Sequence, residues 1–161
     1  MIQLPLPQNG RIVYSTVSTA HTHREMAMIL GGFGLACAID DNDTKAIEGH
    51  LTAKGSPDAE AAGGRTALGY AAFLGREEIA ALLVDAGASL DLPDSAGDTP
   101  LHRAAYNGQL RMAQYLVGKG ARSHHAKNKR GLTPQQLAEQ KGFAELAALL
   151  LEPQAPARQA A

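Results

Sequence analysis

The sequence predicts an all-α solenoid of about four stacked helix-turn-helix units with projecting β-turn or hairpin loops. A segment of about 33 residues recurs, each copy holds two short apolar helix patterns, and the end copies are more polar than the middle ones. The copy from Gly97 to Ala121 reads GDTPLHRAAYNGQLRMAQYLVGKGA, and related copies begin at Gly64 and Gly131. A single helix pair cannot bury both of its apolar sides, so units of this length stack on one another.

Polar and glycine landmarks set the period of the repeat. Thr66, Thr99 and Thr133 follow one another at intervals of 33 and 34 residues, and the glycines that end each first helix keep the same intervals. Several landmarks with one offset leave little room for coincidence. The period therefore predicts repeated structural units rather than one irregular domain.

Each element of the best-preserved unit follows from local chemistry. Thr99 is a good N-cap, Pro100 suits the first helical position, and Gly108 can adopt the left-handed backbone that ends a helix. A second helix is predicted over 110–117, and Gly120 closes it. The segments between units are rich in Asp, Pro, Gly, Ser and Lys, which predicts turns that project as short fingers.

The run from Thr99 to Ala104, T-P-L-H-R-A, resembles the signature of the ankyrin-repeat family. The resemblance covers roughly Leu35 to Leu151. It implies a stack of helical hairpins that binds other proteins, and it implies a structural role for His102, whose side chain would tie neighbouring units together.

The repeat pattern divides the chain into three parts. Residues 1–30 form an extension that we expect to be a partly helical cap, and 153–161 a disordered tail. The repeats occupy 31–152, with units at 31–63 (degenerate), 64–96, 97–130 and 131–152 (the C-terminal capping unit). In the capping unit Gln135 and Glu139 replace Leu101 and Ala105, as suits a face without a further neighbour.

Composition limits the classes of partner and compartment. The formal net charge is −1, which argues against general nucleic-acid or membrane-surface binding. The single cysteine, Cys37, suits a reducing compartment, and no apolar run reaches the roughly 18 residues of a membrane span. We expect a cytoplasmic protein; the apolar stretch 26–39 keeps a periplasmic or secreted location open as an alternative.

No catalytic, cofactor-binding or metal-binding residue is expected. His124 and His125 lack further converging ligands, so they are interpreted as part of a solvated basic tip. The run from Asp40 to Asp43 lacks the glycine and glutamate of a calcium loop, so it is interpreted as a polar turn between helices. Glycine-rich phosphate loops and nucleophile motifs are also missing.

The predicted function is that of a non-enzymatic interaction module. It would bind another protein along the fingers and the ends of the first helices, as a monomer, in the role of a bacterial accessory or immunity-type protein. An exported or host-directed effector is the alternative. The residues assigned to the partner surface are Phe73, Leu74, Asp94, Ser95, Ala96, Asp98, Tyr106, Asn107, His124, His125, Lys127, Lys129, Arg130, Gln140 and Lys141.

Two features of this surface motivate the assignment. Phe73 and Tyr106 stand one period apart, where alanine would suffice for folding, and aligned aromatics resemble an interface hot spot. Ordinary packing under the adjacent finger is the competing interpretation. The middle finger also carries acidic residues and the last finger basic ones, a gradient that would orient a partner.

Overall fold

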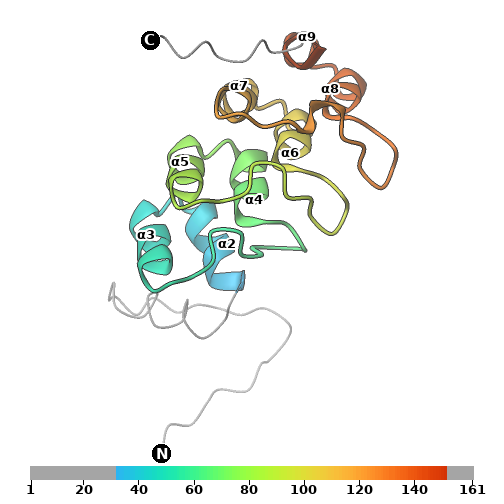
Figure 1. Cartoon of the computed structure of the whole chain (residues 1–161). Helices are drawn as coiled ribbons and strands as arrows, with labels where there is room; N and C mark the ends of the chain where they lie inside the picture. Colours follow the sequence, from blue (N-terminus) through green and yellow to red (C-terminus); the bar gives the residue numbers. More distant parts are fainter. Residues whose placement is uncertain (1–31, 152–161) are drawn as a thin grey trace, which may run out of the picture.

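The computed structural model describes residues 32–151, which form eight α-helices, one short 3-10 helix and no strand (Figure 1). The elements are α2 Gly32–Asp40, α3 Thr44–Thr52, α4 Ala67–Leu74, α5 Glu77–Asp85, α6 Pro100–Tyr106, α7 Leu110–Gly118, η1 Ser123–His125, α8 Pro134–Lys141 and α9 Ala144–Leu151. The all-α repeat architecture is thus confirmed. The predicted N-terminal cap and C-terminal tail lie outside the described residues.

The helices stack as four successive hairpins, α2–α3, α4–α5, α6–α7 and α8–α9 (Figure 1). The first helices form one layer in which α2 packs on α4, α4 on α6 and α6 on α8. The second helices form the other layer, where α3 contacts α5 and α7 contacts α9. One continuous apolar core therefore runs between the two layers.

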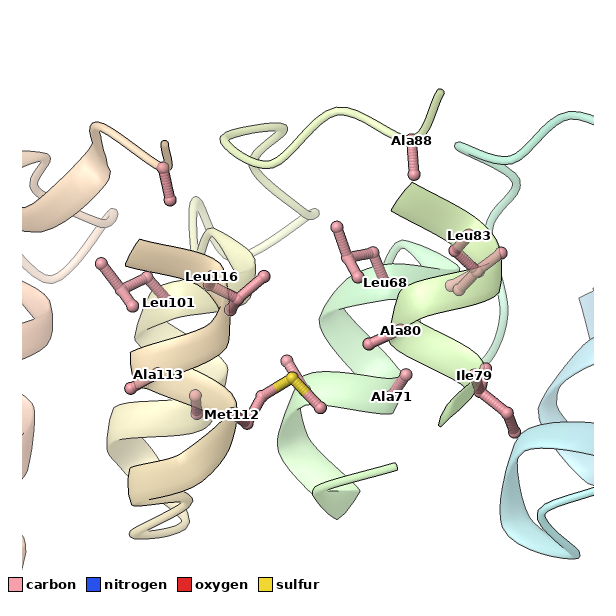
Figure 2. Packing of buried hydrophobic residues seen from close by; sticks show 14 of the residues in the cluster. Leu68, Ala71, Ile79, Ala80, Leu83, Ala88, Leu101, Met112, Ala113 and Leu116 are labelled. Carbon is pink, nitrogen blue, oxygen red and sulfur yellow. The ribbon is translucent and has the colours of Figure 1, made fainter. Parts of the chain in front are cut away.

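Small and branched aliphatic residues build this core (Figure 2). Leu68 and Leu101 stand at equivalent positions of α4 and α6, and both are essentially inaccessible to solvent. Ala71 and Ala104 are fully buried between the same two helices. Because alanine has only a methyl group, the backbones of adjacent first helices can approach closely.

Left-handed backbone ends the first helices as predicted. Gly75, Gly108 and Gly142 have φ angles of 71°, 70° and 83°. In the first unit Asn42 takes this position with φ 55°, since asparagine tolerates the left-handed region better than most residues. Asp43 follows and accepts a hydrogen bond from the Ala46 N–H at 3.0 Å, so the acidic run is indeed a turn between helices.

The apolar stretch 26–39 contributes to the core of the first unit over its described part. Leu35, Ala36, Ala38 and Ile39 are buried on α2; residues 26–31 lie outside the description. None of the helices within 32–151 combines the length and apolar character needed to cross a membrane.

Three fingers project from the stack at 61–65, 94–98 and 128–132, and backbone hydrogen bonds close each one. The closing bonds run from the Ala61 N–H to the Arg65 carbonyl (2.8 Å), from Asp94 to Asp98 (2.9 Å) and from Asn128 to Leu132 (3.0 Å). Neighbouring fingers are joined by bonds from the Ser95 N–H to the Gly64 carbonyl (3.0 Å) and from Lys129 to Ala96 (3.1 Å). The fingers are thus a connected row rather than independent loops.

His102 links the third unit to the last finger, as the resemblance implied. Its ring is fully buried, and Nδ1 accepts a hydrogen bond from the Thr99 N–H at 3.2 Å. Nε2 therefore carries the proton and donates to the Leu132 carbonyl at 3.1 Å. Burial lowers the pKa of His102, against the opposing effect of the bond to Leu132.

Candidate protein-binding surface

Phe73 and Tyr106 form a stacked aromatic pair at the ends of α4 and α6. Their ring centroids lie 6.2 Å apart and the ring planes differ by 29°. Both residues are half-buried, so each remains partly accessible to solvent. The one-period spacing seen in the sequence therefore produces direct contact between the two rings.

A cation covers each end of this pair. The guanidinium carbon of Arg65 lies 5.2 Å from the centre of the Phe73 ring, and the Lys141 Nζ lies 4.2 Å from that of Tyr106. Both distances fall within the range of a cation–π interaction. We call Arg65, Phe73, Tyr106 and Lys141 the aromatic row; it extends across three units.

Polar contacts hold the row in place. The exposed Asn107 donates from Nδ2 to the Phe73 carbonyl at 2.8 Å, which ties the end of α6 to the end of α4. Arg65 also lies 5.6 Å from the Tyr70 ring. The Tyr70 hydroxyl donates to Asp40 Oδ1 at 2.7 Å, and this hydrogen bond raises the pKa of Tyr70.

The acidic side chains of the middle finger bind groups within the protein instead of facing solvent. The Asp94 side chain is 1% exposed and accepts from the N–H groups of Ala96 (2.8 Å) and Asp98 (3.0 Å). Arg103 pairs with Asp94 and lies 3.3 Å from Asp98, whose carboxylate is also buried. A tight turn leaves N–H groups without backbone partners, and aspartate supplies acceptors for them. The predicted acidic tip is therefore largely neutralised from within.

The basic residues of the last finger face solvent. Lys127, Lys129 and Arg130 are exposed. His124 is half-buried and His125 exposed in η1, where their rings meet edge to face at 5.6 Å. The charge gradient expected between the two fingers is thus carried by the basic end.

The remaining predicted residues divide between surface and core. Ser95 and Ala96 are exposed at the tip of the middle finger, and Gln140 is exposed at the end of α8. Leu74 is half-buried and packs against the hydrophobic core.

Comparison with protein families agrees with this architecture. A family model described as ankyrin repeats (3 copies) matches residues 34–125, which is more than half of the chain. The chain belongs to the ankyrin-repeat family. Ankyrin repeats are protein–protein interaction modules. In this chain the fingers and the ends of the first helices are exposed on the same side of the stack.

Similar segments occur in proteins of different kinds. The chain is 43% identical over 86 residues to human diacylglycerol kinase iota, which covers 52% of this chain and 8% of the kinase. It is 36% identical over 75 residues to the probable 26S proteasome regulatory subunit p28 of Saccharomyces cerevisiae, and the matched segment covers 47% of this chain and 33% of p28. It is 38% identical over 94 residues to the calmodulin-binding transcription activator CBT of Oryza sativa, and the matched segment covers 55% of this chain and 10% of CBT. The chain thus spans a third or less of these relatives.

Sequence reasoning missed one member of the aromatic row. Arg65 directly precedes Thr66, the N-cap of α4, at the position that Asp98 occupies before Thr99. Its position in the repeat predicts that Arg65 lies in a finger. The direction of its side chain depends on the folded structure. The available signal was an arginine eight residues before Phe73 in the sequence.

The described residues offer little for other chemistry. Within 32–151, no group of three or more His, Cys, Asp or Glu side chains is arranged to hold a metal ion. Cys37 is an exposed free thiol.

Proposed function

We propose that this ankyrin module binds a protein partner along the aromatic row and the neighbouring finger tips, and that it carries out no reaction itself. The observation that supports the proposal is the stacked pair of Phe73 and Tyr106. Partly exposed large aromatic side chains are typical anchors of protein interfaces.

The fold does not require aromatic residues at these positions. The residues that precede Phe73 and Tyr106, Ala72 and Ala105, are fully buried in the core. The equivalent position of the last unit holds Gln140, which is exposed. Two large rings on top of a finished core add contact area at low entropic cost to an interface.

Ordinary packing is the competing interpretation. Tyr106 packs partly against the core, and stacking with Phe73 contributes about 0.5–1.5 kcal/mol to pairs of this kind. Packing alone, however, does not require that two large aromatic residues remain partly exposed at these positions. The two interpretations therefore differ in where a bound partner lies.

Site-specific crosslinking tests this difference. A photoreactive amino acid replaces Gln140, which is exposed and directly precedes Lys141 of the row, or Gln114, which is exposed on α7 in the other helix layer. The full-length protein is irradiated in extract from its native cells. We expect one dominant protein adduct from position 140 and none from 114. Equal labelling from both positions, or labelling from 114 alone, would contradict the proposed surface.

A further inference from the structure

The cations of the aromatic row lack internal carboxylate partners. Among residues 32–151, aspartates pair with Arg103 and with Lys119, and no carboxylate lies within ion-pair distance of Arg65 or Lys141. The Arg65 Nε is also buried without a hydrogen-bond partner in this part of the chain. Both ends of the row thus present positive charge that the fold leaves uncompensated.

The last finger extends this positive charge. Lys127, Lys129 and Arg130 are exposed, whereas Asp94 and Asp98 are buried against Arg103. Glu77, Glu78 and Asp85 are exposed on α5 and Glu145 on α9, whereas Asp40 and Glu60 are exposed near the Arg65 end of the row. Glu139 on α8 is exposed but accepts a hydrogen bond from Gln135 at 2.8 Å. In a chain of net charge −1, positive charge is therefore concentrated at the Lys141 end of the row and on the last finger.

We propose that the occupant of the aromatic row is an acidic segment of the partner protein. An apolar side chain of this segment would contact the Phe73–Tyr106 pair, and carboxylates on either side would approach Arg65 and Lys141. This inference rests on the proposed function and adds the chemistry of the partner. Charge complementarity of this kind favours an acidic partner and rejects a basic one.

The dimensions of the row suit a short extended segment. The steps from Arg65 to Phe73, to Tyr106 and to Lys141 measure 5.2, 6.2 and 4.2 Å. Together they match no more than about five residues of extended chain at about 3.3 Å per residue. Alternate side chains of an extended chain point the same way. The expected pattern is therefore acidic, any residue, apolar, any residue, acidic.

Carboxylates would also satisfy the exposed donors. A guanidinium stacked on a ring keeps its N–H groups free at its edge, and carboxylate is the acceptor that matches their geometry. A lysine beside a tyrosine ring can bind a carboxylate without leaving the ring. The same cations that stabilise the aromatic pair would thus select the partner.

Selection from a random twelve-residue peptide library tests the inference. The probe is the library itself, displayed on phage and selected against the full-length protein at low salt. We expect enrichment of peptides with acidic residues two positions on either side of an apolar residue. One enriched peptide is then synthesised, together with a matched version in which glutamine replaces both acidic residues.

Variants of the protein locate the binding site. Arg65→Gln and Lys141→Gln should each weaken binding of the acidic peptide about fivefold, and the effect should shrink at high salt. Arg111→Gln removes an exposed cation from α7 and serves as the matched control, with no change expected. The melting temperature of each variant is measured alongside, so that folding losses can be separated from binding losses.

The outcomes distinguish this inference from the proposed function. Enrichment of neutral or basic peptides whose binding depends on Phe73 and Tyr106 overturns the acidic partner but leaves the proposed surface intact. Peptides whose binding ignores the whole row overturn both. A library without enrichment, or binding unchanged by both charge variants, also overturns the acidic-segment inference.

Discussion

At the scale of single residues, His102 shows how one side chain connects two units. The ring accepts from the Thr99 N–H at Nδ1 and donates to the Leu132 carbonyl from Nε2, and the bond at Nδ1 needs the neutral imidazole. Protonation would place a second donor opposite the Thr99 N–H inside the core. The structure therefore favours the neutral form, in agreement with the lowered pKa.

This arrangement predicts acid sensitivity. Because the pKa of His102 is lower in the folded than in the unfolded chain, its contribution is complete above the ordinary histidine pKa of about 6.5 and is lost as pH falls below it. We expect the free energy of unfolding, measured by urea denaturation, to decline as the pH falls below about 6.5. His102→Gln should be less stable at neutral pH, with a shallower decline. Parallel curves for the two proteins would contradict this assignment.

Gly108 meets two demands at once. Its φ is 70°, and a Cβ at this position would lie 2.6 Å from the ring of Phe143. Gly142 has φ 83° at the equivalent place, with nothing within 4 Å of such a Cβ. We expect Gly142→Ala to cost about 1 kcal/mol from backbone strain, and Gly108→Ala to cost more. Adding Phe143→Ala to Gly108→Ala should recover the difference in thermal denaturation; no recovery would show that the ring is irrelevant.

At the scale of elements, local signals made the helices predictable and left the fingers obscure. Capping residues, Pro100 and the terminal glycines act within one turn of chain, so the pattern of the sequence reveals them directly. The fate of Asp94 depends instead on Arg103, whose side chain returns from α6 to the finger. The sequence predicted an acidic middle finger, but Arg103 neutralises its charge in the structure. The exposed basic charge of the last finger was predictable from its residues.

Replacing Arg103 should strongly lower the stability of the protein, because this arginine pairs with two buried carboxylates. Arg103→Met keeps much of the side-chain volume but leaves the buried Asp94 and Asp98 carboxylates without their cation. Removing one partner of a buried ion pair typically costs about 3–5 kcal/mol. We expect a loss in this range in chemical denaturation, with faster amide exchange in residues 94–98. Lys119→Met breaks a pair between exposed side chains and is the control; equal losses in both variants would contradict the proposed network.

At the scale of the whole molecule, the stack aligns short-range features into one surface. Each unit contributes a helix end and each junction between units a finger, and the repeat places them side by side along the same face. The period predicted the contact between Phe73 and Tyr106 because it fixes the register of adjacent units. The capping of this pair by Arg65 and Lys141 could not be predicted, because it requires the orientation of both long side chains.

The exposed charge of the last finger should act mainly on association. Reversing it with Lys129→Glu and Arg130→Glu leaves the buried network intact, since both side chains are exposed. Electrostatic steering changes on-rates more than off-rates. We expect the variant to associate more slowly with the partner identified by crosslinking, as measured by stopped-flow or surface-binding kinetics. The difference in association rate between variant and wild type should shrink at high salt. An effect confined to dissociation would argue against steering.

Binding and stability measured together on the aromatic variants test the central claim most directly. Phe73→Ala and Tyr106→Ala are compared with the wild type and with Gln114→Ala from the other helix layer, for affinity to the captured partner and for thermal midpoint. If the aromatic row anchors the partner, each aromatic variant should lose about 2 kcal/mol or more of binding free energy beyond its loss of stability, and the control neither. Aromatic variants that lose stability but bind the partner as tightly as the wild type would contradict the claim.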